Sequence, residues 1–110
     1  LKGADVEFID RIINRIDENL VNPQFSVEAL ASMMSMTRAN LHLKVKNVTG
    51  ISPVDLIRRI RIETACRMIR DGKYSLTEIA EKTGFNSTSY FTVTFTKVAG
   101  CTPSEYSSKL

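Results

Sequence analysis

Apolar residues recur at intervals of three and four positions along most of the chain, which is the spacing of helices with one buried face. Near the start, this spacing predicts a helix over residues 5–20 whose inner face consists of Val6, Ile9, Ile13, Ile16 and Leu20. We expect Asn22-Pro23 to end this helix. No stretch alternates apolar and polar residues for long enough to form a strand, so the sequence predicts an all-α fold.

Helix-start and helix-stop signals divide the remainder of the chain. Ser26 and Thr37 are each expected to cap a short helix, because a hydroxyl oxygen can accept a hydrogen bond from a free backbone N–H of the first turn. Gly50 is expected to end the second of these helices. Ser52-Pro53 then predicts a long helix, which Asp71-Gly72 closes.

The chain contains an internal repeat with a period near 50 residues. Residues 25–31 match residues 74–80 at an offset of 49, and residues 41–53 match residues 91–103 at an offset of 50. One residue is therefore inserted in the turn of the second copy, around Gly84-Phe85-Asn86. Repeat arrays need about three copies or more, so two copies favour a duplicated unit.

Each copy has the outline of a helix-turn-helix unit, in which a short helix, a tight turn and a second helix pack together. Ala31 and Ala80 would allow the two helices to approach closely, and Met36 and Phe85 would fill the angle between them. In the DNA-binding form of this unit, the second helix enters the major groove. The same outline also occurs in purely structural helical bundles, so the pattern alone leaves both interpretations open.

Charge is distributed unevenly along the chain. The formal net charge is +3, from 15 basic and 12 acidic residues. Residues 1–30 carry a net charge of −3, residues 31–73 carry +6, and residues 74–110 are neutral. A basic middle segment suggests a surface that binds a polyanion, although a solvated helix face rich in arginine would give the same charge.

The composition argues against several classes of protein. The chain of 110 residues suffices for one domain, and it lacks the apolar run of about 18 residues that spans a membrane. Cys66, Cys101 and the single His42 do not make up the ligands of a structural zinc site. Catalytic and nucleotide-binding motifs are absent, so we expect neither an enzyme nor a cofactor. The chain begins at Leu1 rather than Met, and we expect it to be part of a longer protein.

The second half of the chain resembles the signature of the AraC/XylS-type transcription regulators. The residues that carry this resemblance are Ser75–Ala80, Gly84, Phe85, Ser89, Tyr90, Phe91, Phe95, Gly100 and Pro103–Tyr106. The first half fits the same pattern at Leu30, Ala31, Met36, Thr37, Leu41, Lys46, Gly50–Pro53, Arg61 and Ala65. The resemblance implies about seven helices, two helix-turn-helix subdomains joined by a long central helix, and double-stranded DNA as the ligand. The leading helix is most similar to the domains that end hybrid two-component regulators of Bacteroides-type bacteria.

The resemblance also implies which residues face DNA. In the first recognition helix these positions are Arg38, Ala39, His42, Leu43 and Lys46. In the second copy they are Ser87, Thr88, Ser89, Thr92, Val93 and Thr96, with Lys97 as the only cation of that helix. Arginine, histidine and hydroxyl side chains can bind base edges or phosphates.

The sequence departs from the family pattern at three of these positions. Leu43 and Val93 stand where the family usually has an arginine, and Thr96 stands in place of a lysine. Leucine and valine can contact thymine methyl groups but cannot make the bidentate contact to guanine, which is worth about 1–3 kcal/mol. We therefore expect weaker or narrower DNA binding, with the second half mainly positioning the domain.

These observations divide the chain into a leading helix and linker (1–24), a first helix-turn-helix subdomain (25–53), a linking helix (54–71) and a second subdomain (72–110). We expect a cytoplasmic output module of a transcription regulator that binds specific double-stranded DNA sequences. Sensor or receiver domains of the same chain and RNA polymerase are the expected protein partners, and we expect no contact with a membrane. The alternative is a degenerate helix-turn-helix domain that binds proteins, in which the missing arginines mark lost DNA binding.

Several conspicuous side chains are expected to be structural. Arg61 lies on the inner face of the long helix, where we expect an ion pair, and spacing predicts core or turn positions for Met33, Met34, Met36, Tyr90, Phe91 and Phe95. The long helix also carries Arg58, Arg59, Arg67 and Arg70, for which a solvated face and a phosphate-binding strip are equally consistent with the sequence.

Overall fold

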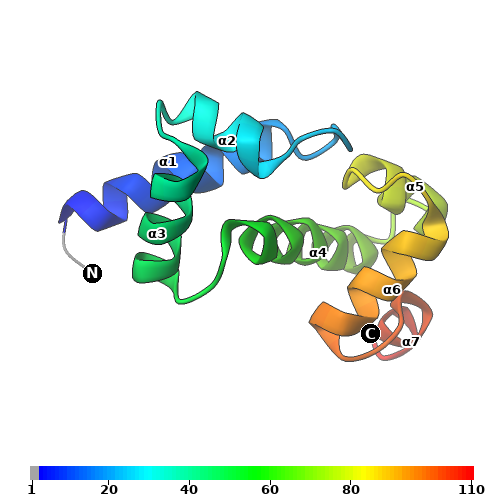
Figure 1. Cartoon of the computed structure of the whole chain (residues 1–110). Helices are drawn as coiled ribbons and strands as arrows, with labels where there is room; N and C mark the ends of the chain where they lie inside the picture. The colour runs from blue at the N-terminus through cyan, green and yellow to red at the C-terminus, as the bar shows by residue number, and fades with distance from the viewer. Residues whose placement is uncertain (1–2) are drawn as a thin grey trace.

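The computed structural model describes residues 3–110 and, within them, contains seven α-helices and no strand (Figure 1). The helices are α1 (Gly3–Glu18), α2 (Val27–Met33), α3 (Arg38–Thr49), α4 (Pro53–Asp71), α5 (Leu76–Lys82), α6 (Thr88–Ala99) and α7 (Pro103–Ser108). The molecule measures 40 × 27 × 21 Å, and α4 links α1–α3 at one end to α5–α7 at the other (Figure 1). The predicted all-α class is confirmed.

Hydroxyl side chains set the starts of the helices. Ser26, Thr37 and Ser52 each accept a hydrogen bond from the backbone N–H three residues further on, at 3.1–3.2 Å. Their caps are the ones that the sequence predicts, and Gly50 and Gly72 end α3 and α4 in the left-handed conformation. The local signals in the sequence therefore determine where most helices begin and end.

The first helix differs from the prediction in both its limits and its buried face. It begins at Gly3 and ends at Glu18, and the chain then leaves the helix before it reaches Asn22-Pro23. Phe8, Ile12 and Ile16 are its buried residues, whereas Val6 is 41% exposed. Phe8 accounts for the difference: an aromatic ring buries more apolar area than Val6 would, and its inward position rotates the face.

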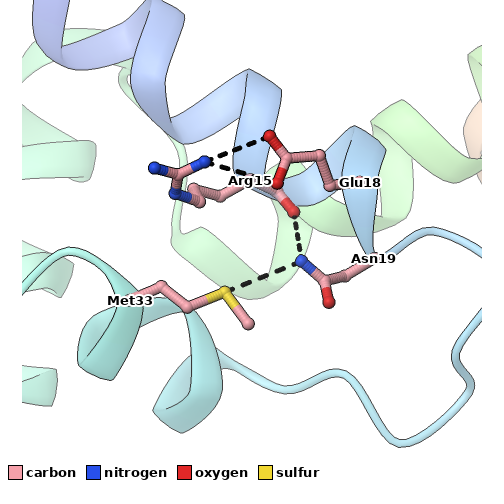
Figure 2. A network of polar contacts seen from close by, with 4 residues as sticks. All are labelled: Arg15, Glu18, Asn19 and Met33. Carbon is pink, nitrogen blue, oxygen red and sulfur yellow. Dashed lines mark hydrogen bonds and ion pairs between the residues drawn. The ribbon is translucent and has the colours of Figure 1, made fainter.

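Asn19 is the residue that follows α1, and its side chain connects that helix to α2 (Figure 2). Its Nδ2 donates to the Arg15 carbonyl at 2.7 Å and to the Met33 sulfur at 3.6 Å. The last carbonyls of a helix have no partner within the helix, and Asn19 supplies one. Met33 is 42% exposed, so its predicted core position is wrong, because its sulfur turns to Asn19 near the surface.

Buried side chains form two cores that share α4. The first core joins α1, α2 and α3 to the early part of α4 and includes Leu41 and Ile57. The second joins the later part of α4 to α5 and α6 and includes Ile62 and Phe91. Tyr90 is 51% exposed, so its predicted core position is wrong: Phe91 occupies the core, and the ring of Tyr90 lies edge-on to Phe85 at the surface, 5.6 Å between centroids.

Arg61 of α4 ties the two ends of the molecule together. Its Nη1 donates to the carbonyls of Leu20 and Thr83, each at 2.6 Å, and its Nη2 donates to the carbonyl of Asn22 at 3.2 Å. The predicted inward position is confirmed by an exposure of 6%. The predicted ion pair is wrong, because the carbonyls that follow α1 and α5 supply the acceptors.

Candidate nucleic-acid interface

Two pairs of helices, α2 with α3 and α5 with α6, are joined by turns that share one hydrogen-bond pattern. The backbone N–H of Met36 donates to the Ala31 carbonyl at 2.9 Å, and the N–H of Phe85 donates to the Ala80 carbonyl at 3.0 Å. Asn86 is the additional residue of the second turn, which leads to the cap of α6. Each pair is thus a short helix, a tight turn and a longer second helix, which is the helix-turn-helix arrangement.

Helix α3 presents all of its predicted DNA-facing positions to solvent. Leu41 and Val45 are buried and hold the helix against the first core. The opposite face is exposed and carries the predicted set of Arg38, Ala39, His42, Leu43 and Lys46. Leu43 is 66% exposed, although it is a large apolar residue. Leu43 is therefore not part of the first core.

Arg38, at the first turn of α3, forms an ion pair with Glu28 of α2. Both side chains are more than half exposed, at 58% and 61%. Exposed pairs of this kind are worth about 0–1 kcal/mol, so a phosphate or a guanine base can displace Glu28. The ion pair therefore orients the Arg38 side chain but does not prevent its guanidinium from binding a ligand.

Helix α6 presents the second predicted set less uniformly. Thr88, Ser89, Val93, Thr96 and Lys97 are exposed and Thr92 is half-buried, while Ser87 caps the helix by accepting from Tyr90 N–H at 3.1 Å.

Two hydroxyls of this set are engaged within α6. Thr92 Oγ1 donates to the Thr88 carbonyl at 2.9 Å, and Thr96 Oγ1 donates to the Thr92 carbonyl at 2.7 Å. Their hydrogen atoms are therefore used inside the helix. Toward a ligand these two residues offer a methyl group and an acceptor oxygen, which suits a base edge better than a phosphate.

A groove of about 900 Å³ lies between α4 and the flank of α6, with Tyr106 of α7 at one side. Val93 and Lys97 line it together with four arginines of α4: Arg58, Arg59, Arg67 and Arg70. The sequence shows these four arginines on the long helix but not that they line a groove. The signal that could have revealed it is the spacing of Arg59, Arg67 and Arg70, eight and three positions apart, which places these three on one side of the long helix.

The described residues offer no other chemistry of note. Within residues 3–110, no group of His, Cys, Asp and Glu side chains is arranged to hold a metal ion. None of the helices in that range is both long and apolar enough to cross a membrane. Cys66 and Cys101 are both free thiols, and burial raises the pKa of the Cys66 thiol, which disfavours its reactive thiolate form.

Two helix-turn-helix units that share one long helix define a tandem helix-turn-helix domain. The family model described as "Helix-turn-helix domain" matches residues 30–109. The chain belongs to the AraC-type family of helix-turn-helix domains, the DNA-binding domains of transcription regulators.

Two relatives illustrate the range of proteins that contain this domain. Histidine kinase P4 of Formosa agariphila is 28% identical over 109 residues, which are 99% of this chain and 8% of that protein. The transcriptional activator RclR of Escherichia coli is 34% identical over 82 residues, which are 74% of this chain and 29% of that protein. The chain therefore spans less than a third of either relative.

Solved structures show the same fold. The C-terminal domain of AraT, a response regulator from Geobacillus stearothermophilus, superposes with a TM-score of 0.86 at 25% identity, over 93% of this chain and 84% of that one. The DNA-binding domain of AdpA, solved in complex with a target DNA, superposes with a TM-score of 0.81 at 28% identity, over 89% and 87% of the two chains.

Proposed function

We propose that this chain binds double-stranded DNA in a sequence-specific manner, as the output module of a transcription regulator. The observation that carries the proposal is the presence of two exposed recognition faces, on α3 and α6, at equivalent positions of the two helix-turn-helix units. The AdpA domain of the same fold is solved in complex with its target DNA.

The length of α4 suits a single chain that reads two segments of DNA. Its 19 residues extend for about 28 Å at 1.5 Å per residue. Successive major-groove segments on one side of a duplex lie about 34 Å apart, and the longest dimension of the molecule is 40 Å. One copy of the chain can therefore place α3 and α6 in adjacent turns of the major groove.

Residues of the two recognition helices have distinct proposed roles. Arg38 and His42 of α3 donate to base acceptors or phosphates, and Lys46 binds the backbone. Leu43 and Val93 occupy the same position in the two helices and contact thymine methyl groups. The remaining proposed contacts are those of Ala39, Ser87, Thr88, Ser89, Thr92, Thr96 and Lys97.

Proposed partners follow from the relatives. A histidine kinase and a response regulator both contain this domain, and we infer that sensor or receiver domains regulate it within a longer chain. RNA polymerase is the proposed partner of the module when it is bound to DNA. We also propose that the module acts in the cytoplasm, where its DNA ligand would be found.

Binding to labelled duplex DNA at increasing salt tests the proposed function. We expect binding to random-sequence duplex at ~50 mM salt, a steep loss of affinity with added salt, and enrichment of one sequence in a selection from random DNA. Arg38→Ala should weaken binding and relax that preference, whereas Arg11→Ala on the exposed side of α1 should do neither. No binding at ~50 mM salt would support the protein-interaction alternative instead.

A further inference from the structure

The groove between α4 and α6 carries a concentration of positive charge that the recognition helices do not account for. Five cationic side chains line it, four from α4 and Lys97 from α6, against the two acidic side chains of Asp55 and Glu63. This leaves three positive charges in excess within one concave surface. Such a surface attracts an anion, because charges in a cleft reinforce one another.

Most of these cations have no acidic partner. Arg58 pairs with Asp55 at 3.4 Å, whereas Arg67 donates to the Thr64 hydroxyl at 3.2 Å and Arg70 to the Tyr106 hydroxyl at 2.5 Å. Arg59 and Lys97 make no side-chain hydrogen bond or ion pair within residues 3–110. The positive charge of the groove is therefore available to a ligand.

We propose that this groove binds the phosphate backbone of the DNA segment that lies between the two recognition helices. The inference rests on the proposed function and assigns a ligand to the α4 arginines. Val93 and Lys97 belong to the recognition face of α6 and also line the groove, so a duplex that α6 enters passes the mouth of the groove.

The arginines of α4 that line the groove form a basic strip. Its length matches the half-turn of DNA between the two major-groove segments. Arg59 and Arg70 are 11 positions apart on α4, which corresponds to about 16 Å along the helix. Half a turn of DNA is about 17 Å, since one full turn is about 34 Å. One strand presents a phosphate about every 3.4 Å along the axis, so the strip is long enough to reach more than one phosphate.

The groove also supplies what the second recognition helix lacks. Lys97 is the only cation of α6, yet the flank of that helix faces four arginines of α4. The planar guanidinium forms paired hydrogen bonds to phosphate. Most of the phosphate contacts of the second half of the domain are thus made by α4 rather than by its own recognition helix.

A double variant, Arg59→Gln with Arg67→Gln, tests the inference without altering a recognition helix. Both side chains are exposed and neither contacts a carboxylate among the residues that the structure describes. Arg11→Gln with Lys73→Gln is the control, which removes the same charge from exposed positions that do not line the groove. Affinity for a selected site and for random duplex is measured over a range of salt, and circular dichroism shows that each variant is folded.

We expect the groove variant to lower the slope of log affinity against log salt by about 1.8, since each lost phosphate contact removes about 0.9. Affinity at ~100 mM salt should fall by about tenfold or more for both DNAs, with the sequence preference unchanged. Hydroxyl-radical protection should weaken only between the two major-groove contacts.

An unchanged slope in the groove variant would overturn the inference while the proposed function stands, and would leave the groove to an acidic protein surface. Failure of the wild-type chain to bind any DNA would instead overturn both. A change equal to that of the control variant would also overturn the inference, because it would show a general effect of charge.

Discussion

The guanidinium of Arg61 occupies the space that a side chain at position 84 would need. The position of Arg61 therefore requires glycine at position 84. Gly84 lies in the turn between α5 and α6, whereas Arg61 lies in the middle of α4. Burial lowers the pKa of the Arg61 guanidinium, and three carbonyl acceptors replace the water that it loses. This contact connects the second turn to the chain that leaves α1.

Gly84→Ala should destabilise the fold by more than about 2 kcal/mol, from backbone strain and from the clash with Arg61 and the Leu20 carbonyl. Gly100→Ala is the matched control, because Gly100 has the same φ of +82° with nothing within 4 Å of an added Cβ. The control should cost only about 1–2 kcal/mol of backbone strain. Urea unfolding measures both, and equal losses would show that the contact with Arg61 is unimportant.

Arg61→Lys should lower the free energy of unfolding by about 2–4 kcal/mol, although the charge is kept. A single ammonium group cannot reach the carbonyls of Leu20, Asn22 and Thr83 in place of the planar guanidinium, and a buried carbonyl without a donor is costly. Arg67→Lys, on the exposed side of the same helix, should change stability by less than about 0.5 kcal/mol. Thermal or urea unfolding that gives the two variants equal stability would contradict this role of Arg61.

Replacing thymine by uracil tests the proposed contacts of Leu43 and Val93, which are 66% and 54% exposed. Uracil lacks the methyl group, and each lost methyl contact should weaken binding by about fourfold, since a buried CH₂ is worth about 0.8 kcal/mol. The effect should appear at two positions of a selected site and vanish at one of them in Leu43→Ala. Uracil elsewhere in the site is the control. Equal affinity of wild type for all uracil-substituted sites would refute the contacts.

The carboxyl groups of Glu78 and Glu105 should make the fold sensitive to acid. They accept hydrogen bonds from the backbone N–H of Ser75 and Thr102, at 3.0 and 2.9 Å, and these bonds hold the pKa of each carboxyl below its ordinary value. A lowered pKa in the folded state means that the stabilisation is complete above the ordinary carboxyl pKa of about 4.3. It is lost as the pH falls through the lowered folded value.

The variant Glu78→Gln with Glu105→Gln should therefore show a shallower loss of stability than wild type as the pH falls from about 5 to about 3. Glu81→Gln, at an exposed position of α5 outside the cap, serves as the control and should follow the wild-type curve. Urea unfolding at a series of pH values gives these curves. A steeper curve for the double variant would reverse the expected sign.

Local signals were sufficient to predict most of the secondary structure. A hydroxyl cap and a terminal glycine act within one helical turn, so the limits of α3 and α4 follow from Thr37, Gly50, Ser52 and Gly72. The exposed face of α3 also follows from the sequence, because Leu41 and Val45 orient the helix against the core. The assignment of individual side chains to DNA contacts remains a prediction.

Contacts between elements far apart in the sequence were not predictable. The partners of Arg61 are carbonyls of residues 22 to 41 positions away, and spacing within one helix carries no information about them. The groove likewise depends on how α4 is rotated relative to α6, which packing of the second core decides. For α1, the predicted face included Val6, whereas the packing of Phe8, Ile12 and Ile16 sets the buried face.

Hydroxyl-radical footprinting of this domain on a site selected from random DNA tests the central claim most directly. The account predicts protection at two major-groove contacts whose centres lie about 10 bp apart, with the backbone between them also protected, produced by a single copy of the chain and with Arg38→Ala weakening only one of the two contacts. Protection confined to one major-groove contact, or two contacts that require two copies of the chain, would contradict a domain in which α4 places both recognition helices on one duplex.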